Sequence, residues 1–212
     1  PSFAQEVDEK WSIKNKGDIE FDDQNQWKHT VEVIYALTDR AEITLSGKTA
    51  KKDDQSLEYK ASKLEGAYLL TDSDYWVKSE VEVGYEMNHL GDADSVEATL
   101  KLKKSFGLWS HKFETSVSHE VGEKKESGLG AEVELEVYHN FENYSLGGAY
   151  EVDFGRLKDN NGYEEQKHYV GPLVSFDLPL GGYNIETEFG YLAGLSRAST
   201  DHVLKYEFEY SF

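Results

Sequence analysis

The chain ends with the stretch His202-Val203-Leu204-Lys205-Tyr206-Glu207-Phe208-Glu209-Tyr210-Ser211-Phe212. From Leu204 onward the even-numbered residues are apolar or aromatic and the odd-numbered residues are polar or charged. A period of two predicts a β-strand with one apolar and one polar face. Ends of soluble domains are usually frayed and polar, so an apolar strand that closes on an aromatic residue restricts the fold classes that fit.

This ending resembles the terminal strand of bacterial outer-membrane β-barrels, in which alternating aromatic residues lead to a final Phe. The resemblance implies that the stretch closes a barrel and that the barrel-insertion machinery recognises it. Because it covers a single strand, the remaining sequence has to support the fold independently.

The bulk composition excludes several classes of protein. The chain has 212 residues, 30% of them charged, and it contains no Cys, which removes disulfides and thiolate chemistry. No run of about 18 or more apolar residues suggests a membrane-spanning helix. A net charge of −19 would repel a phosphate backbone, so we expect no nucleic-acid partner.

Residues 1–10 are polar and without a pattern, and we expect them to form a short periplasmic lead-in to a single domain over residues 11–212. Ser2-Phe3-Ala4 resembles the small-x-small end of a signal peptide. We therefore interpret residues 1–4 as a remnant of a signal peptide cleaved near Ala4, with an arbitrary chain boundary as the alternative.

Alternation of the same kind recurs along the whole chain, for example at Trp27, Val31, Val33, Tyr35 and Leu37. Twelve such segments are separated by turns and loops, and no helix-period segment is present. The sequence thus predicts an all-β fold, a closed antiparallel up-and-down transmembrane β-barrel with 12 strands.

The connections are expected to alternate in length along the chain. Tight turns are predicted after the even-numbered strands, including one at Thr71–Asp74, and longer polar loops after the odd-numbered strands, which is typical of outer-membrane barrels. A change of parity predicts a β-bulge near Ser62-Lys63, and Pro172 predicts a local kink. Loops at 50–56, 88–95, 122–128, 155–166 and 194–200 are predicted.

Alternation alone does not say which face meets solvent. The apolar positions carry almost no charge within the strands, and aromatic residues gather toward the strand ends, which resembles the aromatic belts of membrane proteins. Most histidines share this parity, and interfacial packing explains them better than metal binding does. A soluble acidic β-protein that binds an apolar ligand remains the alternative.

The polar face would then line a pore. Acidic positions cluster on the eighth, ninth, eleventh and twelfth strands, and lysines on the first, second, sixth and seventh. The predicted pore-lining residues are Glu132, Glu134, Glu136, Glu151, Asp153, Glu186, Glu188, Glu207 and Glu209, with Lys14, Lys16, Lys101, Lys103 and Lys112.

Symmetric hairpins predict specific pairs across the strands. Pairing about loop 88–95 would set Glu82 opposite Lys101 and Glu80 opposite Lys103. Pairing about loop 194–200 would set Glu188 opposite Glu207 and Glu186 opposite Glu209. Because like charges across a ladder are unfavourable, the carboxylates need a lysine, a bound cation or protonation.

Sequence signals for catalysis or metal binding are weak, and we expect no enzymatic activity, no cofactor and no metal site. Carboxylate pairs suited to glycoside hydrolysis arise by chance where Glu fills most inward positions. Ser118 and His119 are neighbours on a strand and so point to opposite faces. The run Asp159-Asn160-Asn161-Gly162 lacks the spacing of a calcium loop, and we interpret Asp92 and Asp94 as ordinary turn residues.

In length, strand number and the ending Tyr210-Ser211-Phe212, the chain is similar to small monomeric porins for oligogalacturonate or sialic acid. The lumen of that family is basic, whereas this one is predicted to be acidic and nearly free of arginine, so only the architecture is carried over.

We therefore predict a monomeric porin in the lipid bilayer and lipopolysaccharide of a bacterial outer membrane. A charged lumen selects ions of opposite sign, so its narrow acidic lumen would pass cations or small uncharged hydrophilic solutes. The alternative is a sealed structural or interaction barrel that presents loops 50–56, 122–128 and 155–166.

Overall fold

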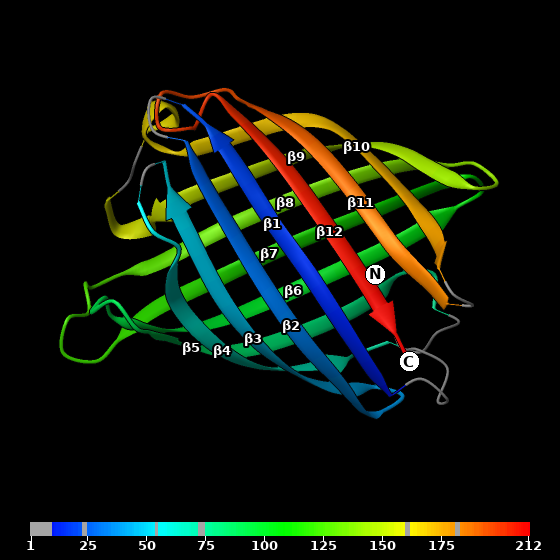
Figure 1. Cartoon of the computed structure of the whole chain (residues 1–212), viewed down its shortest axis with the longest axis horizontal. Helices are drawn as coiled ribbons and strands as arrows, with labels where there is room; N and C mark the ends of the chain where they lie inside the picture. The colour runs from blue at the N-terminus through cyan, green and yellow to red at the C-terminus, as the bar shows by residue number, and fades with distance from the viewer. Residues whose placement is uncertain (1–9, 23–24, 54, 72–74, 160–161, 181–182) are drawn as a thin grey trace.

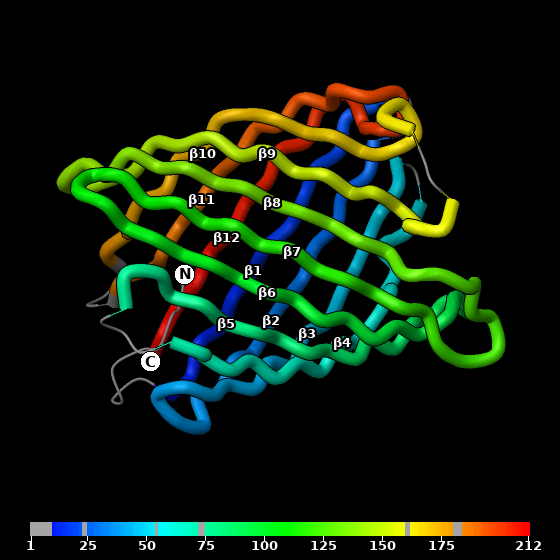
Figure 2. The backbone as a smooth tube through the Cα atoms, turned by 180° about the vertical axis from the view of Figure 1, so that it is seen from behind, coloured from blue at the N-terminus to red at the C-terminus, as the bar shows by residue number. Residues whose placement is uncertain are grey.

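A computed structural model describes residues 10–22, 25–53, 55–71, 75–159, 162–180 and 183–212. The strands form one closed antiparallel barrel in which each pairs with its neighbours in sequence and β1 pairs with β12 (Figures 1 and 2). The strands are β1 Trp11–Phe21, β2 Gln26–Thr38, β3 Ala41–Lys52, β4 Glu58–Leu69, β5 Lys78–Asn88, β6 Asp94–Phe106, β7 Trp109–Val121, β8 Leu129–Asn140, β9 Tyr144–Arg156, β10 Lys167–Leu180, β11 Tyr183–Gly194 and β12 His202–Ser211. The predicted fold class is confirmed.

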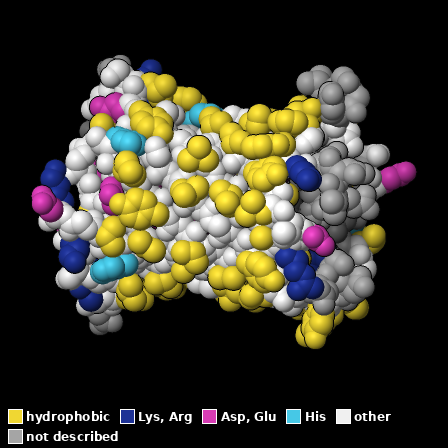
Figure 3. All heavy atoms as spheres, turned by 90° about the horizontal axis from the view of Figure 1, so that it is seen from below, with side chains coloured by type: hydrophobic (Ala, Val, Ile, Leu, Met, Phe, Trp, Pro, Cys, Tyr) yellow, Lys and Arg dark blue, Asp and Glu magenta, His cyan; other side chains and the backbone are white. Residues whose placement is uncertain are grey.

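Exposure on the two faces of the sheet is the reverse of that in a soluble protein. Leu45 is 58% exposed and Val83 55%, whereas Ser12 is 2% and Glu80 6% exposed. The space-filling view shows hydrophobic side chains across the middle of the face that it presents, with charged side chains mostly toward the ends (Figure 3). The alternative of a soluble protein with an apolar interior is therefore wrong, because the apolar positions face outward, where lipid would cover them.

Aromatic side chains of β2 and β12 contact one another on the outside of the barrel, beside β1 and toward the loop end. The Trp27 indole nitrogen donates a hydrogen bond of 2.9 Å to the Tyr206 hydroxyl, which also lies 2.9 Å from His29 Nδ1. The Tyr206 ring covers Gly17, where a Cβ atom would lie 2.5 Å from the hydroxyl oxygen. The sheet thus needs a glycine here for the ring to lie flat.

The seam between β1 and β12 is a regular ladder. Trp11 and Phe212 exchange two backbone hydrogen bonds of 3.1 and 2.8 Å at its end. Lys14 lies opposite Glu209, and Lys16 opposite Glu207. The final strand therefore closes the barrel, as its resemblance to the terminal strands of outer-membrane barrels implied.

The connections only partly follow the predicted alternation in length. Tight connections follow β2, β6, β8 and β10, whereas the longer stretch of residues 70–77 joins β4 to β5. The tight turn expected at Thr71–Asp74 lies mostly outside the described residues. Ala50 and Lys51, expected in a loop, lie in β3. Loop 122–128 lies as predicted, and residues 157–166 contain two short 3-10 turns, Leu157–Asp159 and Tyr163–Glu165.

Two irregularities predicted from the sequence are present. The bulge in β4 lies slightly earlier than expected: Thr49 pairs with Tyr59 and Lys48 with Ala61, which leaves Lys60 as the extra residue. Ala61 is consequently buried, on the inner face instead of the outer. In β10, Gly171 and Pro172 interrupt the ladder to β11 while they remain paired with β9.

Within the described residues no helix is long and apolar enough to cross a membrane. The expected lead-in falls almost wholly outside the described residues, as does the interpretation of residues 1–4 as a signal-peptide remnant.

Candidate channel interior

The predicted pore-lining residues all lie on the inner face, opposite the apolar belt, and most of them form ion pairs. The register of β11 and β12 is as predicted, with Glu186 opposite Glu209 and Glu188 opposite Glu207. A lysine compensates this like-charge ladder, because Lys14 Nζ on β1 lies 3.0 Å from a carboxylate oxygen of Glu207 and 3.0 Å from one of Glu209. Lys16 instead pairs with Glu32 at 2.8 Å.

The predicted register of β5 and β6 is wrong by two residues. Glu80, not Glu82, lies opposite Lys101, and Lys103 lies opposite Lys78. The cause is a shorter loop, since Asp94 accepts a hydrogen bond of 2.9 Å from the Asn88 backbone and so begins β6 early. Lys101 still forms an ion pair with Glu82, diagonally across the ladder.

Charged and polar groups on the inner face join both adjacent strands and strands that are not paired with each other. Lys112 on β7 lies 3.2 Å from both Glu134 and Glu136 on β8. The Tyr138 hydroxyl on β8 donates a hydrogen bond of 2.7 Å to Glu188 on β11. Lys205 on β12 reaches Glu151 on β9 at 2.5 Å. These contacts narrow the middle of the lumen.

An apolar cluster also lies on the inner face, which the sequence did not indicate. It comprises Tyr138, Ala149, Leu173, Leu192 and Val203, one from each of the strands β8 to β12. In the sequence, Leu192 and Val203 stand beside the outward-facing Tyr191 and Leu204, so their inward parity is concealed in a longer apolar run. The acidic side of the lumen is thus partly apolar.

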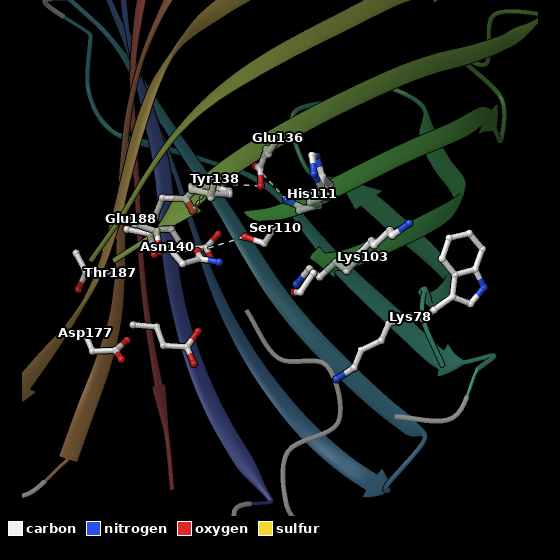
Figure 4. Close-up of a pocket in the computed structure, with 18 of the residues that line it drawn as sticks. Lys78, Lys103, Ser110, His111, Glu136, Tyr138, Asn140, Asp177, Thr187 and Glu188 are labelled. Carbon is white, nitrogen blue, oxygen red and sulfur yellow. Dashed lines mark hydrogen bonds and ion pairs between the residues drawn. The ribbon is translucent and has the colours of Figure 1, made fainter. Parts of the chain in front are cut away.

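A cavity of about 660 Å³ lies inside the barrel at the end where β1 begins, β12 ends and the connections after the even-numbered strands are found. We call it the vestibule. Lys78, Lys103 and Lys112 line one side, from β5, β6 and β7, and carboxylates from β8, β10, β11 and β12 line the other (Figure 4). The carboxylates are those of Glu136, Asp177, Glu186, Glu188 and Glu207.

A smaller cavity of about 100 Å³ lies nearer the loops. Glu114, Glu132, Glu134, Glu151 and Asp153 line it, together with Tyr169. Asp153 pairs with Lys167 at 3.4 Å, but no hydrogen bond or ion pair of the Glu132 carboxylate is found among the described residues. The layer formed by Lys112, Glu134 and Glu136 separates the two cavities.

The weaker chemical hypotheses gain no support. His119 Nδ1 lies 2.9 Å from the Gly128 carbonyl oxygen, with its ring on the outer face away from Ser118. Asp94 closes its loop by accepting hydrogen bonds from Asn88 and from the Tyr85 hydroxyl. Asn160 and Asn161 lie outside the described residues, so the calcium-like run is not described as a whole.

No protein-family model matches this sequence, and no curated protein matches it. The fold is similar to that of an outer-membrane channel from Pseudomonas putida F1, with a TM-score of 0.69 at 11% identity over 100% of this chain and 99% of that one. The β domain of the Bordetella autotransporter Brka gives 0.55 at 14% identity over 96% and 99%. The Acinetobacter baumannii outer-membrane protein Omp33 gives 0.53 at 8% identity over 98% and 100%.

At such identities the likeness establishes the fold, and these neighbours are bacterial outer-membrane proteins. The barrel and its apolar belt fit the same location for this chain. The chain has the architecture of bacterial outer-membrane β-barrels.

Proposed function

We propose that this protein is a monomeric outer-membrane channel with a narrow, acidic lumen that passes cations or small uncharged hydrophilic solutes. The observation that carries the proposal is the vestibule, a polar cavity of about 660 Å³ within a barrel whose outside is apolar. Side chains just fill the interior of a barrel of about eight strands, and the diameter grows with the number of strands, so twelve strands leave room for a channel.

The preference for cations follows from the excess of carboxylates over lysines on the inner face. Among the described residues, the smaller cavity on the loop side is lined by five carboxylates and by no lysine. A ring of one sign of charge favours ions of the opposite sign, and low-dielectric walls strengthen that field.

The test is the reversal potential of the refolded protein in a planar bilayer under a KCl gradient. We expect discrete current steps and a reversal potential on the cation-selective side. The double variant with Glu188→Gln and Glu207→Gln should move that potential toward zero, because it removes two carboxylates from the vestibule wall. Glu142→Gln, in the turn between β8 and β9, neutralises one carboxylate outside the lumen and should have no effect. Anion selectivity would contradict the acidic lumen.

A sealed barrel is the second candidate, and the bridges across the lumen favour it. The Tyr138–Glu188 hydrogen bond and the Lys205–Glu151 ion pair each span from one strand to the third strand along. Absence of current from folded, inserted protein would support this reading. The loops would then be the functional surface, among them residues 122–128, which Arg156 joins to the barrel by an ion pair with Glu126.

A further inference from the structure

The layer between the two cavities is built around the ammonium group of Lys112 on β7. Its Nζ lies 3.2 Å from a carboxylate oxygen of Glu134, 3.2 Å from one of Glu136 and 3.9 Å from one of Glu114. In the strand pairing Glu136 lies opposite Lys112, whereas Glu134 lies opposite Glu114. Like charges across a ladder are destabilising, and the three donor hydrogens of one ammonium group offset this repulsion. We call these three carboxylates the septum cluster.

Further contacts hold the septum cluster in place. The Glu136 side chain is 7% exposed. The Tyr138 hydroxyl lies 3.4 Å from its carboxylate and donates a hydrogen bond to Glu188 on β11 (Figure 4). Among the described residues, no cation other than Lys112 forms an ion pair with any carboxylate of the cluster. Removal of this lysine would therefore leave three carboxylates close together without an ion pair.

The septum cluster and its lysine meet both cavities. Lys112 and Glu136 line the vestibule, and Glu114 and Glu134 line the loop-side cavity. A solute that moves between these cavities along β7 and β8 therefore passes the ammonium group and its carboxylates. The charges at this point act on every ion that takes this path.

Carboxylates gathered in this way are the ligands that divalent cations take. Ca²⁺ binds several carboxylate and other oxygens, and Mg²⁺ gives up its water reluctantly. In the septum cluster those oxygens already contact a positive charge that is attached to the barrel. A monovalent cation has less need of such ligands, because its smaller charge binds its water less strongly.

We propose that Lys112 determines the selectivity of the lumen: its ammonium group fills the septum cluster, so that monovalent cations pass and divalent cations are excluded. The excess of carboxylates on the inner face still attracts cations, whereas the attached ammonium group occupies the place at which a divalent cation would bind. This inference rests on the proposed cation channel and names the class of cation that it admits.

The first measurement is calorimetric titration of the folded barrel in detergent with CaCl2. Lys112→Met keeps the length of the side chain without its charge, and it should gain one calcium site relative to the wild type, with a Kd of about 10⁻⁴–10⁻³ M. Glu134→Gln added to Lys112→Met should abolish the gained site. Lys48→Met is the matched control: this inner-face lysine pairs with Glu86 alone among the described residues, so the variant should gain no site.

The second measurement is the potassium current through the inserted barrel after addition of CaCl2 to about 5 mM, above that Kd. The wild-type current should not change, whereas that of Lys112→Met should fall at least about twofold, because calcium then occupies the septum cluster.

Wild-type calcium binding that Glu134→Gln abolishes, or a wild-type current that calcium blocks, would overturn the inference, and neither result needs the Lys112 variant to fold. So would the lack of a gained site in Lys112→Met that circular dichroism shows to be folded, or an equal gain in Lys48→Met. In a barrel that conducts, these results contradict this inference alone. A gained calcium site in a barrel that carries no current would show that Lys112 fills the cluster and would contradict the channel alone.

Discussion

Lys14 shows how a single side chain resolves a conflict built into the sheet. The register of β11 and β12 forces Glu186 opposite Glu209 and Glu188 opposite Glu207. Lys14 enters from the next strand and contacts Glu207 and Glu209 together, where Glu209 is only 3% exposed. Loss of one partner of a buried pair leaves an uncompensated charge, which costs far more than the pair itself contributes.

Gly147 allows the Tyr138 ring to lie close against the sheet, as Gly17 does for the Tyr206 ring. The Tyr138 ring lies over Gly147, where a Cβ atom would come within 2.6 Å of both the ring and the Val137 carbonyl oxygen. That placement allows the hydroxyl to reach Glu188 across the lumen.

Gly147→Ala should therefore destabilise the barrel by about 1–3 kcal/mol, the usual cost of overpacking, by displacing the Tyr138 ring. Gly148→Ala is the matched control, because its nearest atom would be the Gly171 carbonyl oxygen at an ordinary 3.5 Å. Urea unfolding followed by tryptophan fluorescence measures both. Equal midpoints for the two variants would contradict the close approach.

At the scale of the strand, the bulge in β4 sets which face each residue occupies. Lys60 is the extra residue between Tyr59, which faces outward, and Ala61, which faces inward. Without it the strand would alternate regularly and every other side chain would keep its face. Its ion pair with Glu58 is solvent-exposed, and such pairs contribute little.

Deletion of Lys60 should therefore yield a folded barrel of nearly unchanged stability. Deletion of Thr99 from the regular strand β6 should prevent folding, because a one-residue slip turns one half of the strand inside out. Far-UV circular dichroism and protease resistance in detergent distinguish the two outcomes. Failure of both deletions would show that the bulge itself is required.

The parts of the sheet that could be predicted are those in which apolar and polar residues alternate regularly in the sequence. Strand number, closure and the β11–β12 register follow from long alternating runs about a symmetric loop. The β5–β6 register does not, because an Asp at position 94 is typical of a loop, whereas its hydrogen bond to the Asn88 backbone places it at the start of β6. The inward Leu192 and Val203 could not be recognised, since each adjoins an outward apolar residue and only neighbouring strands fix its direction.

For the whole molecule, the two ends of the lumen differ in size and in charge. The vestibule has about 660 Å³ and both signs of charge, whereas the loop-side cavity has about 100 Å³ and is lined by carboxylates. Because the two ends differ in this way, we expect a channel of this shape to conduct ions unequally in the two directions.

We expect the current through a single inserted barrel to rectify in symmetric KCl. It should be larger when cations enter from the loop side, where the carboxylates raise their local concentration. Higher salt should reduce the asymmetry, because the Debye length falls from about 10 Å at 0.1 M to about 3 Å at 1 M. Current–voltage curves at both concentrations test this, and a linear curve at low salt would contradict it.

The ladder between β1 and β12 is as continuous as that between any other pair of strands, and the hydrogen bonds between Trp11 and Phe212 extend it to the first residue of β1. The barrel is therefore a ring of paired strands whose pairing does not depend on which strand comes first in the chain. A circular permutant that joins residues 11 and 212 by a short linker and opens within loop 122–128 would keep every strand contact. The order of synthesis, and with it the strand that is presented last, could then be changed without altering the finished structure.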